Sequence, residues 1–151
     1  MKVSFRFDKE IGWVTDVPDR SRVYIKDSIV ERPDLFSSNE HLALAMGSCT
    51  SSDVISIFRK MKAEYTSFRC EVDAERATEH PKTITKADIH YIIDGNVTRE
   101  QAFKAIGLSL TKYCSVSILA RRGGTALTFS LTLNGEKVSS HLAPEQAVQT
   151  S

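Results

Sequence analysis

Two cysteines are the residues of this 151-residue chain whose type and spacing could do chemistry. Cys49 and Cys114 lie 65 positions apart, and each falls in a stretch that predicts the inward face of a helix. If the fold brings them together, the two thiols can cycle between a reduced form and a disulfide. No other pair of side chains in the sequence supports such a cycle.

The surroundings of Cys49 favour a reactive thiol over an inert one. A free cysteine on an apolar face is most often a small core residue, and Cys70 fits that description. Cys49 instead lies between Gly47-Ser48 and Thr50-Ser51-Ser52, which leave access to the sulfur and offer hydrogen-bond donors. The thiolate is the reactive form and a free thiol has a pKa of about 8.5, so Cys49 needs a cation or aligned N–H groups from elsewhere.

Composition excludes several classes of function. The 20 Lys and Arg against 19 Asp and Glu give a net charge of +1, so we expect neither nucleic acid nor an anionic membrane as a partner. The N-terminus has no apolar signal region and the chain has no membrane-spanning run, which predicts a soluble cytoplasmic protein. The three cysteines form no CxxC pair and have no His at zinc-ligand spacing. We therefore expect no metal and no cofactor.

The first third of the chain predicts a β-meander followed by a long helix. Alternating apolar residues predict strands near 3–7, 13–14 and 23–25. The capping box Ser37-Ser38-Asn39-Glu40 starts a helix whose apolar series runs to Met61, with a possible bend at Gly47-Ser48. Glu40 and Cys49 are nine residues apart, on opposite sides of an unbroken helix. They share a site only if the helix bends or Glu40 comes from a second copy.

The remainder predicts two paired strands, a second helix and a final strand. Strands over 68–74 and 87–93 should pair antiparallel, with Cys70 on the apolar face. A second capping box, Thr98 to Gln101, starts a helix that holds Tyr113 and Cys114 on its inward stripe and stops at 121–124. A strand over 127–133 and an Asn134-Gly135 turn follow. We expect one domain over 1–138 and a loosely ordered polar tail over 139–151.

The two cysteine motifs resemble those of the OsmC/Ohr family of bacterial thiol peroxidases. The residues that carry the resemblance are Ser38 to Leu42, Ala45 to Thr50, Asp53-Val54 and Lys112 to Val116. The order of elements agrees over nearly the whole chain, and the broad OsmC-like branch is the most similar. The resemblance implies an α+β fold with antiparallel sheets packed on two long central helices, in an intertwined homodimer.

The resemblance also implies an activity and its residues. Cys49 would be the peroxidatic thiol and Cys114 the resolving one, reducing organic hydroperoxides and hydrogen peroxide with electrons from an external thiol. An Arg would stabilise the thiolate and Glu40 would hold that Arg; Arg32 is the first choice, with Arg20 and Arg22 as alternatives. The chain lacks the Pro that the family has just before the acidic residue, and the nearest is Pro33.

The same residues are compatible with other interpretations. Arg32 could be a solvated loop residue, and Glu40 could serve only the capping box. Leu44, Met46, Phe58 and Tyr113 could line a pocket for hydrophobic peroxides, although core packing is their commoner role. The chain could also be a non-enzymatic redox sensor, a small-molecule binding protein or a structural dimer. A cysteine hydrolase is disfavoured because the four His residues form no Cys-His signature.

Overall fold

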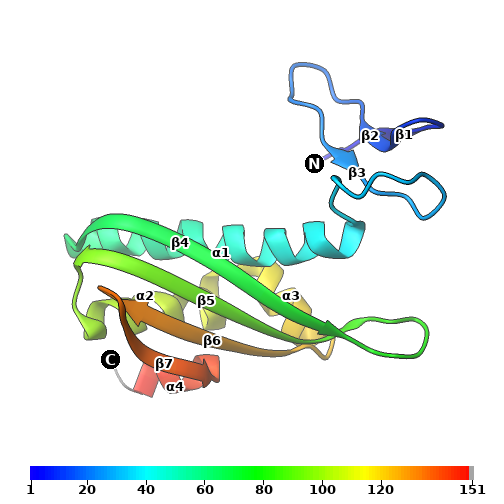
Figure 1. Ribbon diagram of the computed structural model, residues 1–151. Coiled ribbons are helices and arrows are strands. Elements are labelled where there is room, and N and C mark those ends of the chain that lie inside the picture. Colours follow the sequence, from blue (N-terminus) through cyan, green and yellow to red (C-terminus); the bar gives the residue numbers. More distant parts are fainter. Residues whose placement is uncertain (150–151) are drawn as a thin grey trace. The chain divides into compact units, whose positions relative to one another are not determined.

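The computed structural model describes residues 1–149, in two compact units that divide between Leu42 and Ala43 (Figure 1). The first unit holds strands β1 (Phe5–Asp8), β2 (Gly12–Thr15) and β3 (Tyr24–Ile25) and the start of helix α1 (Ser38–Met61). The rest of α1 and all later elements belong to the second unit: β4 (Glu64–Arg76), β5 (Ile84–Asn96), α2 (Arg99–Leu108), the π-helix η1 (Ser109–Tyr113), α3 (Ser115–Arg122), β6 (Ala126–Leu133), β7 (Glu136–Leu142) and α4 (Pro144–Gln149).

The first unit is the predicted meander. Strands β1, β2 and β3 pair antiparallel in that order. Trp13 organises it: Phe5 and Phe7 pack edge-on against the indole with ring centroids 5.6 and 5.1 Å away. The indole N–H donates to Asp27 over 2.9 Å, so the polar end of the ring is also satisfied.

Helix α1 begins with the predicted capping box. The carboxylate of Glu40 accepts hydrogen bonds from Ser37 N at 2.7 Å and Ser37 Oγ at 2.6 Å. Glu40 N donates back to Ser37 Oγ over 3.3 Å, which satisfies backbone donors at the helix start. The helix then runs unbroken to Met61, without the possible bend at Gly47.

Close packing explains Gly47 better than bending does. A Cβ on this residue would lie 2.8 Å from Val72 Cγ2 and 3.4 Å from Cys70 Sγ on strand β4. Helix α1 can therefore lie against the strand only because position 47 has no side chain.

The second unit packs helices on a four-stranded sheet of order β4-β5-β6-β7 (Figure 1). Strands β4 and β5 pair antiparallel as predicted, with Cys70 opposite Tyr91. Strands β5 and β6 are parallel, so the expectation of purely antiparallel sheets is wrong. The reason is the connection through α2, η1 and α3, since parallel neighbours need a crossover of a dozen or more residues.

The core of the second unit lies between the helices and the sheet. Fully buried side chains from α1, α2, η1 and the strands form one cluster; the largest are Met46, Phe58, Ile89, Tyr91, Ile93, Phe103, Ile106, Leu110, Phe129 and Leu131. Met46 and Phe58 are therefore core residues. Leu44 and Tyr113, the other two candidates for a peroxide pocket, are each 51% exposed.

The predicted second long helix is three segments, and this corrects the sequence-based expectation. After α2 the chain makes a π-turn, in which Cys114 N donates to Ser109 O over 2.8 Å. Cys114 itself has φ −71° and ψ 98°, which is extended rather than helical, and α3 starts after it. The wider turn explains why Tyr113 is half exposed instead of facing inward.

The segment from 139 onward is ordered as far as residue 149, so the expectation of a loose tail is wrong there. Strand β7 continues to Leu142 and α4 follows at once. Ala147 of α4 is fully buried, and a Cβ on Gly107 would lie 3.1 Å from its Cβ. Thr150 and Ser151 lie outside the described residues, and the predicted domain boundary at 138 stays a prediction.

Candidate functional site

Cys49 and Cys114 are neighbours in the second unit. The Cys49 side chain lies near enough to the Cys114 thiol to raise the pKa of that thiol. Both thiols are free. They differ in access, because Cys49 is partly exposed whereas Cys114 has no exposed surface. The arrangement is a reduced cysteine pair with one accessible member.

Cys114 occupies the N-cap position of helix α3. Its sulfur accepts a hydrogen bond from Ser117 N at 3.4 Å and lies 3.2 Å from Ser117 Oγ. Burial raises the pKa of the Cys114 thiol, Ser117 opposes this through its hydrogen bonds, and the adjacent Cys49 raises the pKa further. Cys114 is therefore a buried neutral thiol that already has donors for a thiolate.

A buried chain of hydroxyl groups joins the two cysteine segments. Thr50 Oγ1 lies 2.7 Å from both Tyr91 Oη and Ser109 Oγ, and Ser109 Oγ donates to Asp53 Oδ2 over 3.0 Å. A carboxylate only accepts and a hydroxyl donates once. With the Ser109 proton directed to Asp53 Oδ2 or to Thr50 O, which lies 3.4 Å away, Thr50 donates to Ser109 and Tyr91 donates to Thr50.

This series of hydrogen bonds positions each cysteine through a residue that is covalently or hydrogen bonded to it. Thr50 follows Cys49 on α1, and the carbonyl of Ser109 accepts from Cys114 N. Thr50, Tyr91 and Ser109 are fully buried, so each hydrogen bond lies in a low-dielectric environment where a lost partner is costly. We name these four residues, Thr50, Asp53, Tyr91 and Ser109, the hydroxyl relay.

Cys70 is a packing residue in this structure. It is partly buried on β4 against the core cluster. Burial raises the pKa of its thiol, which disfavours the reactive thiolate, and the nearby Ser51 side chain opposes this shift only in part.

The predicted acidic and basic site residues have partners within the first unit. Arg32 forms a bidentate salt bridge with Asp34: Nε donates to Oδ1 over 2.9 Å and Nη2 donates to Oδ2 over 2.7 Å. This pair lowers the pKa of Asp34 to about 2, so it stays ionised at physiological pH. Glu40 is bound to Ser37, which lowers the pKa of its carboxyl group. The alternatives Arg20 and Arg22 are exposed.

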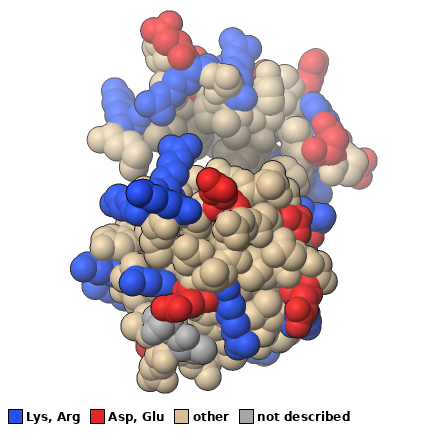
Figure 2. All heavy atoms as spheres, turned by 90° about the vertical axis from the view of Figure 1, so that its left-hand side faces the viewer, with Lys and Arg blue, Asp and Glu red and all other residues tan. Residues whose placement is uncertain are grey.

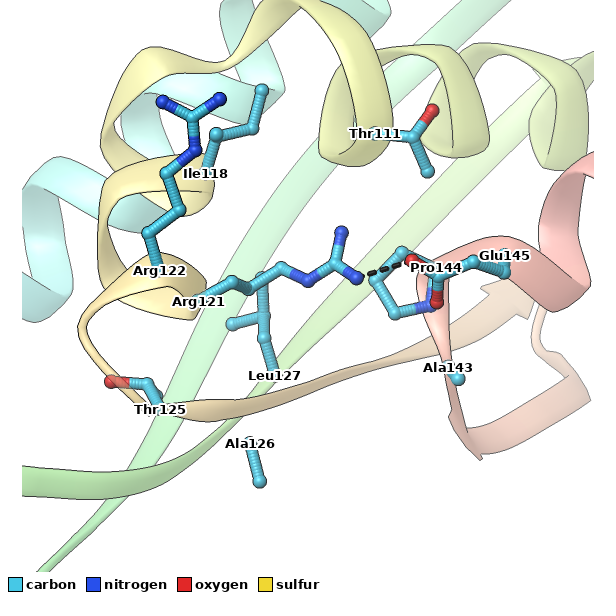
Figure 3. A pocket seen from close by; sticks show the side chains of 10 residues that line it. All are labelled: Thr111, Ile118, Arg121, Arg122, Thr125, Ala126, Leu127, Ala143, Pro144 and Glu145. Atoms are coloured by element: carbon cyan, nitrogen blue, oxygen red, sulfur yellow. Dashed lines mark hydrogen bonds and ion pairs between the residues drawn. The ribbon is translucent and has the colours of Figure 1, made fainter.

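A cavity of about 600 Å³ borders the same segments that hold Cys114 (Figure 3). Thr111 of η1 and Ile118, Arg121 and Arg122 of α3 line it, together with residues of β6 and α4, but no cysteine does. Figure 3 shows the Arg121 guanidinium beside Pro144 and bound to Glu145. Arg121 Nη1 also donates to Leu110 O over 3.4 Å, so this side chain ties α3 to η1 and α4.

Within residues 1–149, no group of three His, Cys, Asp or Glu side chains is arranged to hold a metal ion. None of the described helices combines the length and apolarity needed to cross a bilayer. On the face drawn in Figure 2, basic and acidic side chains are interspersed, in keeping with the net charge of +1.

Sequence reasoning missed Ser117 and the hydroxyl relay as parts of the site. The signal for Ser117 is its place three residues after Cys114, the spacing of an N-cap residue and its N3 donor. The signal for the relay is weaker: Thr50 and Ser109 are polar residues on stripes that otherwise predict core packing.

Comparison with known proteins identifies the fold and the family. Residues 32–130 match the family model described as OsmC-like protein. Protein YhfA of Escherichia coli K12 is 31% identical over 87 residues, which make up 57% of this chain and 65% of YhfA. The match thus covers less than two thirds of that relative's length.

Solved structures agree with this match. The OsmC-like protein from Mycoplasma pneumoniae superposes with a TM-score of 0.73 at 11% identity, covering 87% of this chain and 95% of that chain. An organic hydroperoxide resistance protein from Elizabethkingia anophelis gives 0.67 at 14%, covering 89% and 97%. At such identities these likenesses show a shared fold. Because the family model covers more than half of the sequence, this chain belongs to the OsmC-like protein family.

Proposed function

We propose that this protein is a thiol-dependent peroxidase that reduces organic hydroperoxides, and hydrogen peroxide less well. The observation that carries the proposal is an accessible thiol, Cys49, beside a buried thiol, Cys114. Their segments meet where Thr50, the residue after Cys49, lies 2.7 Å from Ser109, whose carbonyl accepts from Cys114 N. An accessible thiol is needed to meet the peroxide. A neighbouring thiol is needed to turn the product into a disulfide.

The proposed oxidation has two balanced steps. The Cys49 thiolate attacks one peroxide oxygen, the O–O bond breaks, and the alkoxide leaves and takes a proton to become an alcohol. Cys49 is then a sulfenic acid. The Cys114 thiol condenses with it, forming the S–S bond and releasing water. An external dithiol returns two electrons and restores both thiols.

Arg32 and Glu40 are proposed to support the Cys49 thiolate, as the family resemblance implies. The guanidinium would stabilise the thiolate and polarise the peroxide, and Glu40 would orient it. Because α1 is unbroken, the nine-residue spacing places Glu40 and Cys49 on opposite sides of the helix. A homodimer would supply Glu40 from a second copy, and the exposed Leu44, Tyr113 and Leu119 offer apolar surface for such a partner.

One observation favours a second candidate, a thiol redox sensor or small-molecule binding protein of the same fold. Arg32 is bound to Asp34 and Glu40 to Ser37. If these contacts persist in solution, the Cys49 thiolate lacks that cation and oxidises slowly. Such a protein would form the disulfide but turn over poorly.

Steady-state hydroperoxide consumption separates the two candidates. The wild type, Cys49→Ser and Cys114→Ser are compared with an organic hydroperoxide and hydrogen peroxide, using a dithiol reductant, and Cys70→Ser is the matched control. The peroxidase requires turnover in the wild type and Cys70→Ser and its loss in Cys49→Ser. Disulfide formation without turnover supports the sensor.

A further inference from the structure

We infer that the Cys49–Cys114 disulfide is reduced from one side only: the external thiolate attacks Cys49 Sγ, and Cys114 leaves as a thiolate held by Ser117. The inference rests on the proposed function and specifies the direction of its reductive half-reaction. Ser117 thereby acquires a role that the sequence did not suggest.

Access determines which sulfur is attacked. Thiol–disulfide exchange needs the incoming thiolate to reach one sulfur on the side away from the bond that breaks. Cys114 has no exposed surface, whereas Cys49 is partly exposed. An external thiol therefore meets Cys49 first, and Cys114 becomes the leaving group.

The environment of Cys114 suits a leaving thiolate. A disulfide breaks faster when the departing sulfur is a better anion. Cys114 Sγ lies 3.4 Å from Ser117 N and 3.2 Å from Ser117 Oγ, at the N-terminus of α3 where the helix dipole is positive. In the reduced protein the Cys114 thiol donates to the Ser117 hydroxyl. Once the sulfur is an anion, that hydroxyl can turn and donate to it.

The electron balance is complete with a dithiol as reductant. Its first thiolate forms a bond to Cys49 Sγ, the Cys49–Cys114 bond breaks, and the electron pair goes to Cys114. Its second thiol then attacks the sulfur now bound to Cys49, giving a cyclic disulfide and the Cys49 thiolate. Two electrons pass from the dithiol to the protein.

Adduct mapping on the wild type tests the direction of attack. The protein disulfide is made with diamide instead of peroxide, so the result does not depend on peroxidase activity. A short exposure to 2-mercaptoethanol, quenched by rapid alkylation, is followed by peptide mass mapping. We expect the mixed disulfide on Cys49 and the alkyl group on Cys114. An adduct on Cys114, equal adducts on both, or failure of diamide to join the two cysteines would overturn the inference.

A serine substitution series tests the leaving group. In Ser117→Ala, reduction of the diamide-formed disulfide by dithiothreitol should slow by about fivefold, because the departing thiolate loses one hydroxyl donor. Ser117→Thr keeps the hydroxyl and should restore the rate. Ser115→Ala, an exposed position at the start of the same helix, should not change it. Simple loosening of the packing would expose Cys114 and speed reduction, so an unchanged or faster Ser117→Ala contradicts the role.

Discussion

Thr50 Oγ1 lies 2.7 Å from Ser109 Oγ, and this contact joins the helix that carries Cys49 to the segment that ends at Cys114. The two residues are 59 positions apart in sequence and fully buried. The geometry of the cysteine pair therefore depends on polar contacts as well as on apolar packing.

Replacing Thr50 by Val tests this dependence. The shape is kept but the hydroxyl is lost, so Tyr91 and Ser109 each lose a buried partner, and the free energy of unfolding should fall by about 1–3 kcal/mol. Disulfide formation by diamide should also slow, since Cys114 is held less firmly. Urea unfolding and a diamide time course measure the two effects. Thr66→Val, at an exposed position on β4, is the control; equal behaviour of both variants would refute a positioning role.

Tyr91 gives a pH-dependent prediction. Burial raises the pKa of its phenol well above that of a solvent-exposed tyrosine, with the Thr50 hydrogen bond opposing the shift. The folded protein thus keeps a proton that the unfolded chain releases. The contribution of Tyr91 to the free energy of unfolding is therefore fully present below about pH 10 and is lost as the pH rises further.

The substitution Tyr91→Phe removes this titrating group. At neutral pH the free energy of unfolding of the variant should be about 1 kcal/mol lower than that of the wild type. Above about pH 10 its unfolding midpoint should decline less steeply than that of the wild type. Thermal unfolding across the alkaline range measures it. Parallel declines would show that other groups cause the alkaline loss.

Gly47→Ala should destabilise the protein even though Ala favours helices over Gly by about 1 kcal/mol. The new Cβ would lie 2.8 Å from Val72 Cγ2, so α1 must move away from β4 at a cost of about 1–3 kcal/mol. Val72→Ala should recover part of the loss when combined with it. A double-mutant cycle by chemical unfolding shows the coupling, and additive effects would argue against the steric explanation.

Glu40→Gln separates the cap of α1 from the proposed role in catalysis. Glutamine also serves in a capping box, so the unfolding midpoint should stay within experimental error. If the carboxylate orients an arginine, peroxide turnover should fall by about tenfold or more. Unchanged turnover would leave Glu40 with the cap alone.

Arg32 can be distinguished from its two alternatives by alanine substitution. Arg32→Ala should lower kcat/KM for the hydroperoxide by about tenfold or more, whereas Arg20→Ala and Arg22→Ala should change it by less than about twofold. Asp34→Asn removes the bidentate salt bridge to the Arg32 guanidinium and should raise kcat/KM for the hydroperoxide. A large loss in Arg20→Ala or Arg22→Ala instead would reassign the role.

The sequence predicted the features that depend on local patterns. Short-range alternation and spacing predict the meander, both capping boxes and the antiparallel pairing of the strand that holds Cys70 with the strand that holds Tyr91. All of these predictions are confirmed. The family resemblance is also confirmed.

The missed features depend on tertiary structure. A π-turn adds one residue to a turn without changing the apolar pattern, so that pattern does not reveal the extended conformation of Cys114. The parallel pairing of β5 and β6 could have been inferred from the long helical connection between them. The hydroxyl relay requires contacts between residues on three elements, which one sequence does not reveal.

Single-turnover trapping tests the central claim most directly. Cys114→Ser is treated with one equivalent of an organic hydroperoxide in the presence of dimedone, and the modified residue is identified by peptide mass mapping. A two-cysteine peroxidase predicts a sulfenic acid on Cys49, while the wild type treated in the same way gives a Cys49–Cys114 disulfide. No label, or a label on Cys70 instead, would contradict the proposed peroxidase.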